Sequence, residues 1–223
     1  MLQKVAKGLC ELNDNMVFVG GAVLELYATD AAASDIRPTF DVDCILELRS
    51  RSEHSKLEEN LRSKGFIHDT SDNAPICRWI YQGIKVDIMP ANSAILGFSN
   101  RWYAEGIENK VPEILPDGTE IFLLSPEYFF AVKFEAHKSR GGMDLRQSHD
   151  FEDIIYLLDN NPDIFLSVSH AKSTVKEYLQ SECKNLLENV DLIEGIESAL
   201  PYGSEVERID MIMILINKIA EIS

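Results

Sequence analysis

The chain has 223 residues, of which 45% are hydrophobic and 26% charged, an ordinary composition for a globular protein with one large or two modest domains. Its formal net charge of −16 is unusual. It argues against a nucleic-acid coat protein or a membrane-surface protein, because either would need a basic face. We therefore expect no extensive nucleic-acid-binding surface and no membrane association.

The cysteines and the apolar runs indicate the cellular compartment. The four cysteines lack the paired spacing of zinc or redox sites, which favours reduced, mostly buried thiols. The N-terminal residues show no signal-peptide pattern, and the apolar run 211–216 is too short to cross a bilayer. We expect a cytoplasmic protein.

The first part of the chain alternates between helical and strand-like patterns. Glycine and proline punctuate it: Gly65 favours the end of a helix, and Gln82-Gly83 between two apolar runs favours a tight antiparallel hairpin. Residues 31–38 are expected to form a loop. The predicted helices cover 2–13, 22–29, 52–64 and 101–107, and the predicted strands cover 16–19, 40–48, 76–81, 84–89 and 121–124.

The pattern becomes helical from residue 125 onwards. Ser125 as N-cap, Pro126 at the first helical position and Glu127 in the first turn predict a helix to about residue 137. A basic loop over 138–146, a helix from about Ser148 and two or three acidic helices follow. Residues 151–223 hold 14 acidic and 5 basic side chains. We predict an α/β (α+β) protein, with a short mixed sheet and flanking helices in 1–124 and a helical domain in 125–223.

Three carboxylates on two predicted strands are the most informative residues. Asp41 and Asp43 are two positions apart, so their side chains project from the same face of a strand. Their neighbours Phe40 and Val42 indicate apolar surroundings, in which paired carboxylates cost several kcal/mol unless a cation offsets them. Together with Asp87 on the next hairpin, they predict a site for Mg²⁺ or Mn²⁺.

The order of these motifs carries a resemblance to a known family. Gly20-Gly21 follows a strand and precedes a helix, and Arg37-x-Thr39-x-Asp41-x-Asp43 and the hairpin aspartate Asp87 come after it. This order resembles the nucleotidyltransferase fold of the DNA polymerase β superfamily. The downstream segments 124–133 and 148–154 are similar to the AbiEii/AbiGii toxin-type nucleotidyltransferases and their bacterial relatives, and the resemblance spans about residues 14–160.

The resemblance implies an enzyme that moves a nucleoside monophosphate from an NTP to an acceptor hydroxyl and releases pyrophosphate. It implies that Asp41, Asp43 and Asp87 are the catalytic, metal-binding residues and that Asp87 helps to deprotonate the acceptor. The backbone N–H groups of the two glycines would lie near the phosphates at a helix N-terminus. The implied nucleotide-binding residues are Gly20, Gly21, Arg37, Thr39 and Lys133.

Other interpretations of the same residues stay open. The glycines also suit an ordinary turn and Lys133 a solvated helix position, and we expect Asp150 and Asp153 to stabilise the start of a helix. The alternative functions are a catalytically silent protein that binds a partner through its acidic C-terminal helices, as in a toxin–antitoxin pair, and an enzyme that adenylylates an antibiotic. The acceptor could be a small molecule, a protein or the end of an RNA.

Overall fold

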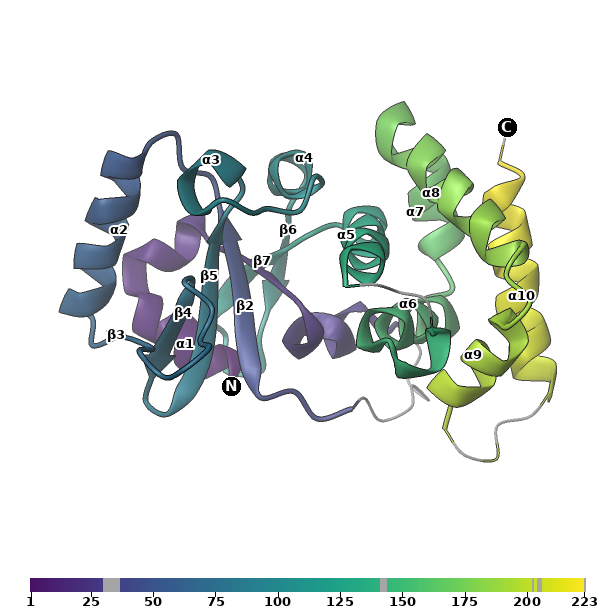
Figure 1. Cartoon of the computed structure of the whole chain (residues 1–223), viewed down its shortest axis with the longest axis horizontal. Coiled ribbons are helices and arrows are strands. Elements are labelled where there is room, and N and C mark those ends of the chain that lie inside the picture. The colour runs from purple at the N-terminus through teal and green to yellow at the C-terminus, as the bar shows by residue number, and fades with distance from the viewer. Residues whose placement is uncertain (30–36, 141–143, 202, 204–205, 223) are drawn as a thin grey trace. The chain divides into compact units, whose positions relative to one another are not determined.

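The computed structural model describes residues 1–29, 37–140, 144–201, 203 and 206–222 (Figure 1). The chain forms two compact units. The first comprises Met1–Val23 and Arg37–Ser125, and the second comprises the described parts of Leu24–Ile36 and Pro126–Ser223. Most of the predicted loop 31–38 and part of the predicted basic loop 138–146 lie outside the described residues.

The first unit is built on a mixed sheet, as the sequence predicts. The described residues form seven strands in the order β3-β4-β5-β2-β1-β7-β6 (Figure 1). The pairs β2/β5 and β1/β7 are parallel, and the other neighbours are antiparallel. The strands are β1 (Val17–Val19), β2 (Asp41–Leu46), β3 (Ile67–His68), β4 (Arg78–Tyr81), β5 (Ile84–Pro90), β6 (Val111–Ile114) and β7 (Glu120–Leu123).

Helix α2 shows how local sequence fixes the helices of this unit. The Ser50 hydroxyl accepts a hydrogen bond from Glu53 N at 3.2 Å, and the Glu53 carboxylate accepts one from Arg49 N at 2.7 Å. The first bond satisfies a backbone donor that the first turn would leave free, and the second holds the residue before the cap. The helix ends just before Gly65, whose φ of +87° confirms the predicted stop. The helical elements are α1 (Leu2–Leu9), η1 (Cys10–Asn15), η2 (Gly21–Tyr27), α2 (Arg51–Ser63), α3 (Ser93–Leu96) and α4 (Tyr103–Glu108).

The predicted hairpin between β4 and β5 is confirmed. Gln82 and Gly83 form its turn with φ of 48° and 80°, both in the left-handed region that a two-residue hairpin requires. The strands pair from Tyr81 opposite Ile84 to Arg78 opposite Asp87. The turn therefore sets the register of every cross-strand pair in this hairpin.

Several elements differ from the sequence prediction. The predicted helix 2–13 divides at Cys10, whose φ is 50°, into α1 and the 3₁₀ helix η1. The predicted helix 22–29 is the 3₁₀ helix η2. The strands β3 and β6 and the short helix α3 were not predicted, because two to four residues with little apolar periodicity give no local signal.

The second unit is helical, and its first two helices begin where the sequence predicts. Helix α5 starts at Pro126, and Ser148 caps α6 by accepting a hydrogen bond from Phe151 N at 3.2 Å. Four further helices follow among the described residues, rather than the predicted two or three. The helices are α5 (Pro126–Ser139), α6 (His149–Asn160), α7 (Ile164–His170), α8 (Ser173–Leu187), α9 (Leu192–Ala199) and α10 (Val206–Ala220), with the 3₁₀ turn η3 (Leu145–Gln147) before α6.

The end of η2 packs within the second unit, although the predicted boundary at residue 125 assigned it to the first. The rings of Tyr27 and Phe129 lie 4.3 Å apart between centroids. The Asn161 side chain donates a hydrogen bond to the Tyr27 carbonyl at 2.8 Å, and Thr29 N donates to the Asn160 carbonyl at 3.0 Å. Throughout the described part of the chain, every helix is too short or too polar to cross a membrane.

Candidate functional site

A row of four register partners crosses the middle of the sheet in the first unit. Val19 on β1 lies opposite Asp43 on β2, Asp43 lies opposite Asp87 on β5, and Asp87 lies opposite Arg78 on β4. Partners in a β ladder project their side chains from the same face, and Asp41, two residues before Asp43, shares that face. The structure therefore brings the three predicted carboxylates together on one face of the sheet.

Arg78 neutralises part of this cluster. Its Nε donates to Asp87 Oδ1 and its Nη2 to Asp87 Oδ2, both at 2.7 Å, and Nη2 also lies 3.3 Å from Asp41 Oδ2. The side chains of Arg78 and Asp87 are only 18% and 11% exposed, so water screens this pair weakly. The pKa of the Arg78 guanidinium is raised above its usual range, chiefly by the hydrogen bond to Asp87. Arg78 therefore supplies a cation to Asp87 and, at the longer distance, to Asp41.

The two glycines of the turn after β1 approach the same residues. Gly20 has a φ of +74°, and a Cβ atom at this position would overlap Oδ2 of Asp43. A Cβ atom on Gly21 would lie 2.7 Å from Thr39 Cγ2 and 3.2 Å from Arg37 Nη2. Only glycine fits this close approach without displacing its neighbours. Gly20 thus lies beside Asp43, and the adjacent Gly21 lies close to Arg37 and Thr39.

The apolar surroundings that the sequence predicts for the aspartates of β2 are present only in part. Phe40 is 80% exposed, so its predicted contribution to the apolar surroundings of the site is wrong. Val42 and Cys44 are fully buried, because they alternate with the aspartates and project to the opposite face. The aspartates share their own face of β2 with Ile45, which is also fully buried.

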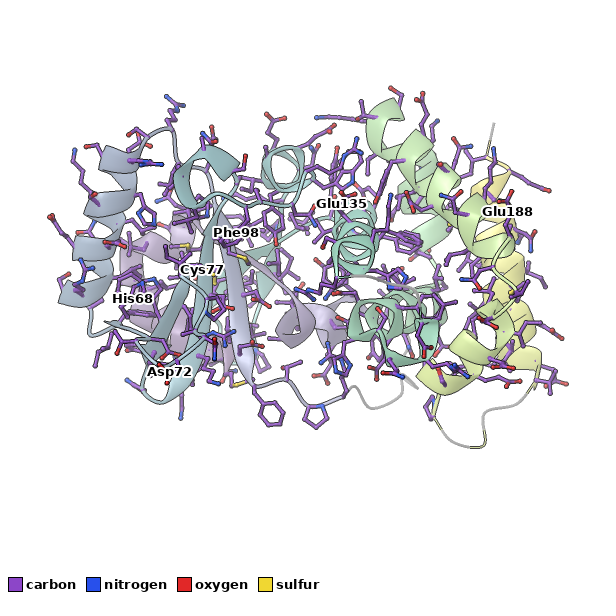
Figure 2. The ribbon with its side chains drawn as sticks, viewed as in Figure 1. His68, Asp72, Cys77, Phe98, Glu135 and Glu188 are labelled. Atoms are coloured by element: carbon purple, nitrogen blue, oxygen red, sulfur yellow. The ribbon has the colours of Figure 1, made fainter. Side chains whose placement is uncertain are left out.

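Two buried thiols near the carboxylates have raised pKa values. Cys77, labelled in Figure 2, comes directly before Arg78, and its pKa is raised to about 12 by burial and by the nearby charge of Asp87. Burial, with smaller effects of Asp43 and Asp87, also raises the pKa of the Cys44 thiol well above its usual range. Both thiols are therefore protonated at neutral pH and are poor nucleophiles or metal ligands.

The predicted site residues suit the metal in their chemistry but not in their arrangement. Carboxylate oxygens are the ligands that Mg²⁺ and Mn²⁺ prefer, so the chemistry of the donor set suits either ion. The arrangement does not, because the guanidinium of Arg78 takes up both oxygens of Asp87. Throughout the part of the chain that the structure describes, no three Asp, Glu, His or Cys side chains are arranged to hold a metal ion.

Lys133, the remaining predicted site residue, lies on α5 in the second unit. Its Nζ is 2.5 Å from Asp153 Oδ2 and 3.3 Å from Asp150 Oδ1, and Arg140 pairs with the other oxygen of Asp150 at 2.7 Å. The side chains of Lys133, Asp150 and Asp153 are 7%, 5% and 0% exposed. The alternative of a solvated Lys133 is therefore wrong. Asp150 lies in the first turn of α6, where the sequence places it, but Asp153 lies beyond that turn; the cap itself is Ser148, and both aspartates also pair with the lysine.

Arg78 is the site residue that the sequence interpretation missed. Its position was nevertheless available from the predicted hairpin. With Gln82-Gly83 as the two-residue turn, pairing outwards from Tyr81 and Ile84 places Arg78 opposite Asp87. An arginine opposite an aspartate in a hairpin predicts an ion pair.

Comparison with models of known protein families and with curated proteins gives no match for this chain.

Proposed function

We propose that the chain is a nucleotidyltransferase that moves a nucleoside monophosphate from an NTP to an acceptor hydroxyl. The observation that carries this proposal is the convergence beside Asp43 of Gly20 and Asp87, which come from two other segments of the chain, with Gly21 close to Thr39. These residues are also the ones that give the sequence its resemblance to the polymerase β superfamily.

The residues present suit the chemistry of nucleotidyl transfer. The acceptor oxygen forms a bond to the α-phosphorus while the bond from that phosphorus to the bridging oxygen breaks, and pyrophosphate leaves. The backbone N–H groups of Gly20 and Gly21 and the guanidinium of Arg37, close to Gly21, would bind phosphate oxygens. A carboxylate on the same face, Asp87 or Asp43, would accept the proton of the acceptor hydroxyl.

A divalent ion would supply further neutralisation of phosphate charge. Asp41, Asp43 and Asp87 are the residues that would hold Mg²⁺ or Mn²⁺. Because Arg78 occupies both carboxylate oxygens of Asp87, its side chain would have to move before Asp87 could bind an ion.

The ion pair of Arg78 also favours a second candidate function. A protein that uses this fold only to bind a partner would retain a neutralised, structural carboxylate cluster. NTP binding separates the two candidates, because a silent protein of this kind would not require nucleotide. The partner surface would then be the acidic helices of the second unit, where residues 151–223 carry 14 acidic and 5 basic side chains.

The acceptor class follows from charge. Acidic side chains outnumber the basic ones, 37 to 21, so we expect no broad basic face for many phosphate contacts. We propose a hydroxyl on a small molecule, such as an antibiotic or metabolite, or on a protein, or at most the end of an RNA held by few phosphate contacts. Binding of RNA fragments at rising ionic strength tests this. If the affinity for RNA fell with salt as steeply as about six phosphate contacts require, the proposal would be contradicted.

The test of the proposed function is transfer of label. The protein is incubated with each α-labelled NTP, Mg²⁺ or Mn²⁺, and total RNA, protein extract or a metabolite extract. We expect one fraction to gain label and Asp43→Asn to abolish the transfer. Absence of both NTP binding and transfer in the folded wild-type protein would reject a transferase and favour the silent binding protein.

A further inference from the structure

Helix α10 of the second unit presents apolar side chains to water on the side away from its core (Figure 1). Its buried residues recur at intervals of three or four positions and pack within the unit, as in any amphipathic helix. Met211 and Ile214, which are neighbours on the helix surface, are nevertheless 63% and 54% exposed. Together with the half-buried Leu215, they form what we call the α10 strip.

Acidic side chains lie at the N-terminal end of the α10 strip. Glu207 and Asp210 are both exposed, and each lies one helical turn before a member of the strip. Arg208 is the basic residue in this half of the helix, and its Nε donates a hydrogen bond to Asp159 Oδ1 on α6 at 2.6 Å. Its charge is therefore directed at Asp159 rather than at the acids beside the strip. The surface combines apolar contact area with negative charge.

We propose that the α10 strip is a docking surface for a lysine- and arginine-rich amphipathic helix of a partner protein. The ridge of side chains along one helix packs into the groove of another, so a second helix complements a strip that follows a helix. The apolar residues of the partner would cover Met211 and Ile214, and its cations would lie opposite Glu207 and Asp210. The proposal goes beyond nucleotidyl transfer and holds whether or not the chain is an enzyme.

The charge around the strip selects this partner over two others. A second copy of the chain would bring together two molecules of net charge −16, which repel each other. An anionic lipid surface would meet the same acids, and residues 151–223 add to the repulsion with 14 acidic and 5 basic side chains. A basic helix is instead attracted by this charge and steered towards it.

The first test measures how tightly the whole chain binds a synthetic amphipathic peptide of about five helical turns, with leucine on one face and lysine on the other. Fluorescence anisotropy of the labelled peptide should show saturable binding, whereas the same peptide with glutamate in place of lysine should not bind. Asp210→Lys should weaken binding about tenfold, because it replaces attraction by repulsion. Asp72→Lys makes the same change of charge in the first unit, where Figure 2 labels Asp72, and should weaken binding about twofold or less. Equal losses would show that the peptide follows net charge, and would overturn the proposal.

A second pair of variants tests the apolar part of the strip. Ile214→Ser changes an exposed side chain, so the fold should persist while peptide binding weakens about fivefold through lost apolar contact. Ile76→Ser is the matched control, because Ile76 lies in the first unit and is 59% exposed, and it should bind like the wild type. Unchanged binding in Ile214→Ser would overturn the proposal. So would a wild-type chain that sediments as a dimer and becomes a monomer in Ile214→Ser, since the strip would then belong to a second copy.

A third measurement uses only the wild-type protein. In the chain labelled with ¹⁵N, the lysine peptide should shift the backbone amide resonances of α10 more than those of the other helices. Equal shifts across all the acidic helices, or no binding even at low ionic strength, would overturn the docking surface. NTP binding and transfer are measured separately, because failure of the proposed transferase would leave the peptide affinity of α10 unchanged.

Discussion

Asp43 and Asp87 lie directly opposite each other on β2 and β5, two parallel neighbours in the sheet, and Gly20 closes over the carboxylate of Asp43. This relationship joins three segments that are distant in the sequence. It makes the close approach of the glycine turn, rather than the aspartates alone, the most sensitive feature of the site.

Replacing Gly20 by alanine should therefore cost more than the same change at Gly65. Both glycines have positive φ, 74° and 87°, so both variants incur the strain of a left-handed alanine, about 1–2 kcal/mol. Only at Gly20 would the new methyl group meet a neighbour, since nothing lies within 4 Å of a Cβ on Gly65. We expect an extra loss of about 1–3 kcal/mol in the free energy of unfolding by urea. Equal losses would show that Asp43 moves aside freely.

The neighbouring Gly21→Ala variant should be rescued by a change at Thr39. The added Cβ would lie 2.7 Å from Thr39 Cγ2, so we expect a loss of stability of about 1–3 kcal/mol. Thr39→Ser removes that methyl group, and in the double variant most of the loss should be recovered. The measurement is a double-mutant cycle of urea unfolding. Additive effects of the two changes would mean that the turn does not pack against Thr39.

Removing Lys133 should destabilise the second unit strongly. Lys133→Met leaves Asp153, which is fully buried, and Asp150 without their shared cation, and breaking a buried pair in this way costs about 3–5 kcal/mol. Asp153→Asn in the same background should restore part of the loss. Arg146→Met is the control, because Arg146 pairs with Asp144 at 3.1 Å in the same unit and the two side chains are 54% and 38% exposed, so its loss should cost much less. A loss in Lys133→Met no larger than in Arg146→Met would contradict the buried network.

Alkylation should modify one cysteine of the folded protein. Cys10 is exposed, whereas Cys44, Cys77 and Cys183 are buried and have raised pKa values. With its pKa raised to about 12, Cys77 has about one thiolate in ten thousand at pH 8, and only the thiolate reacts. Iodoacetamide at pH 8 should therefore add one group by mass spectrometry, and none in Cys10→Ser. In urea, all four cysteines should react, so modification of Cys77 in the native protein would show that the site opens.

The sequence by itself determined the features that depend on neighbouring residues. The cap at Ser148, the start at Pro126 and the stop at Gly65 are local hydrogen-bonding and dihedral effects, and the structure has all of them. The two-residue turn at Gln82-Gly83 also fixed the register of its hairpin, and with it the pairing of Arg78 and Asp87. Alternation along one strand placed Asp41 and Asp43 on a common face.

Only the tertiary structure decided which segments meet. No periodicity within β2 specifies that β5 is its parallel neighbour, that Asp43 lies opposite Asp87, or that Gly20 approaches Asp43. The burial of Lys133 between two aspartates likewise depends on how α5 packs against α6, whereas its sequence position suits a solvated helix face equally well. Such pairings are fixed by the packing of distant segments into one core, and a local sequence pattern does not specify which distant segment it contacts.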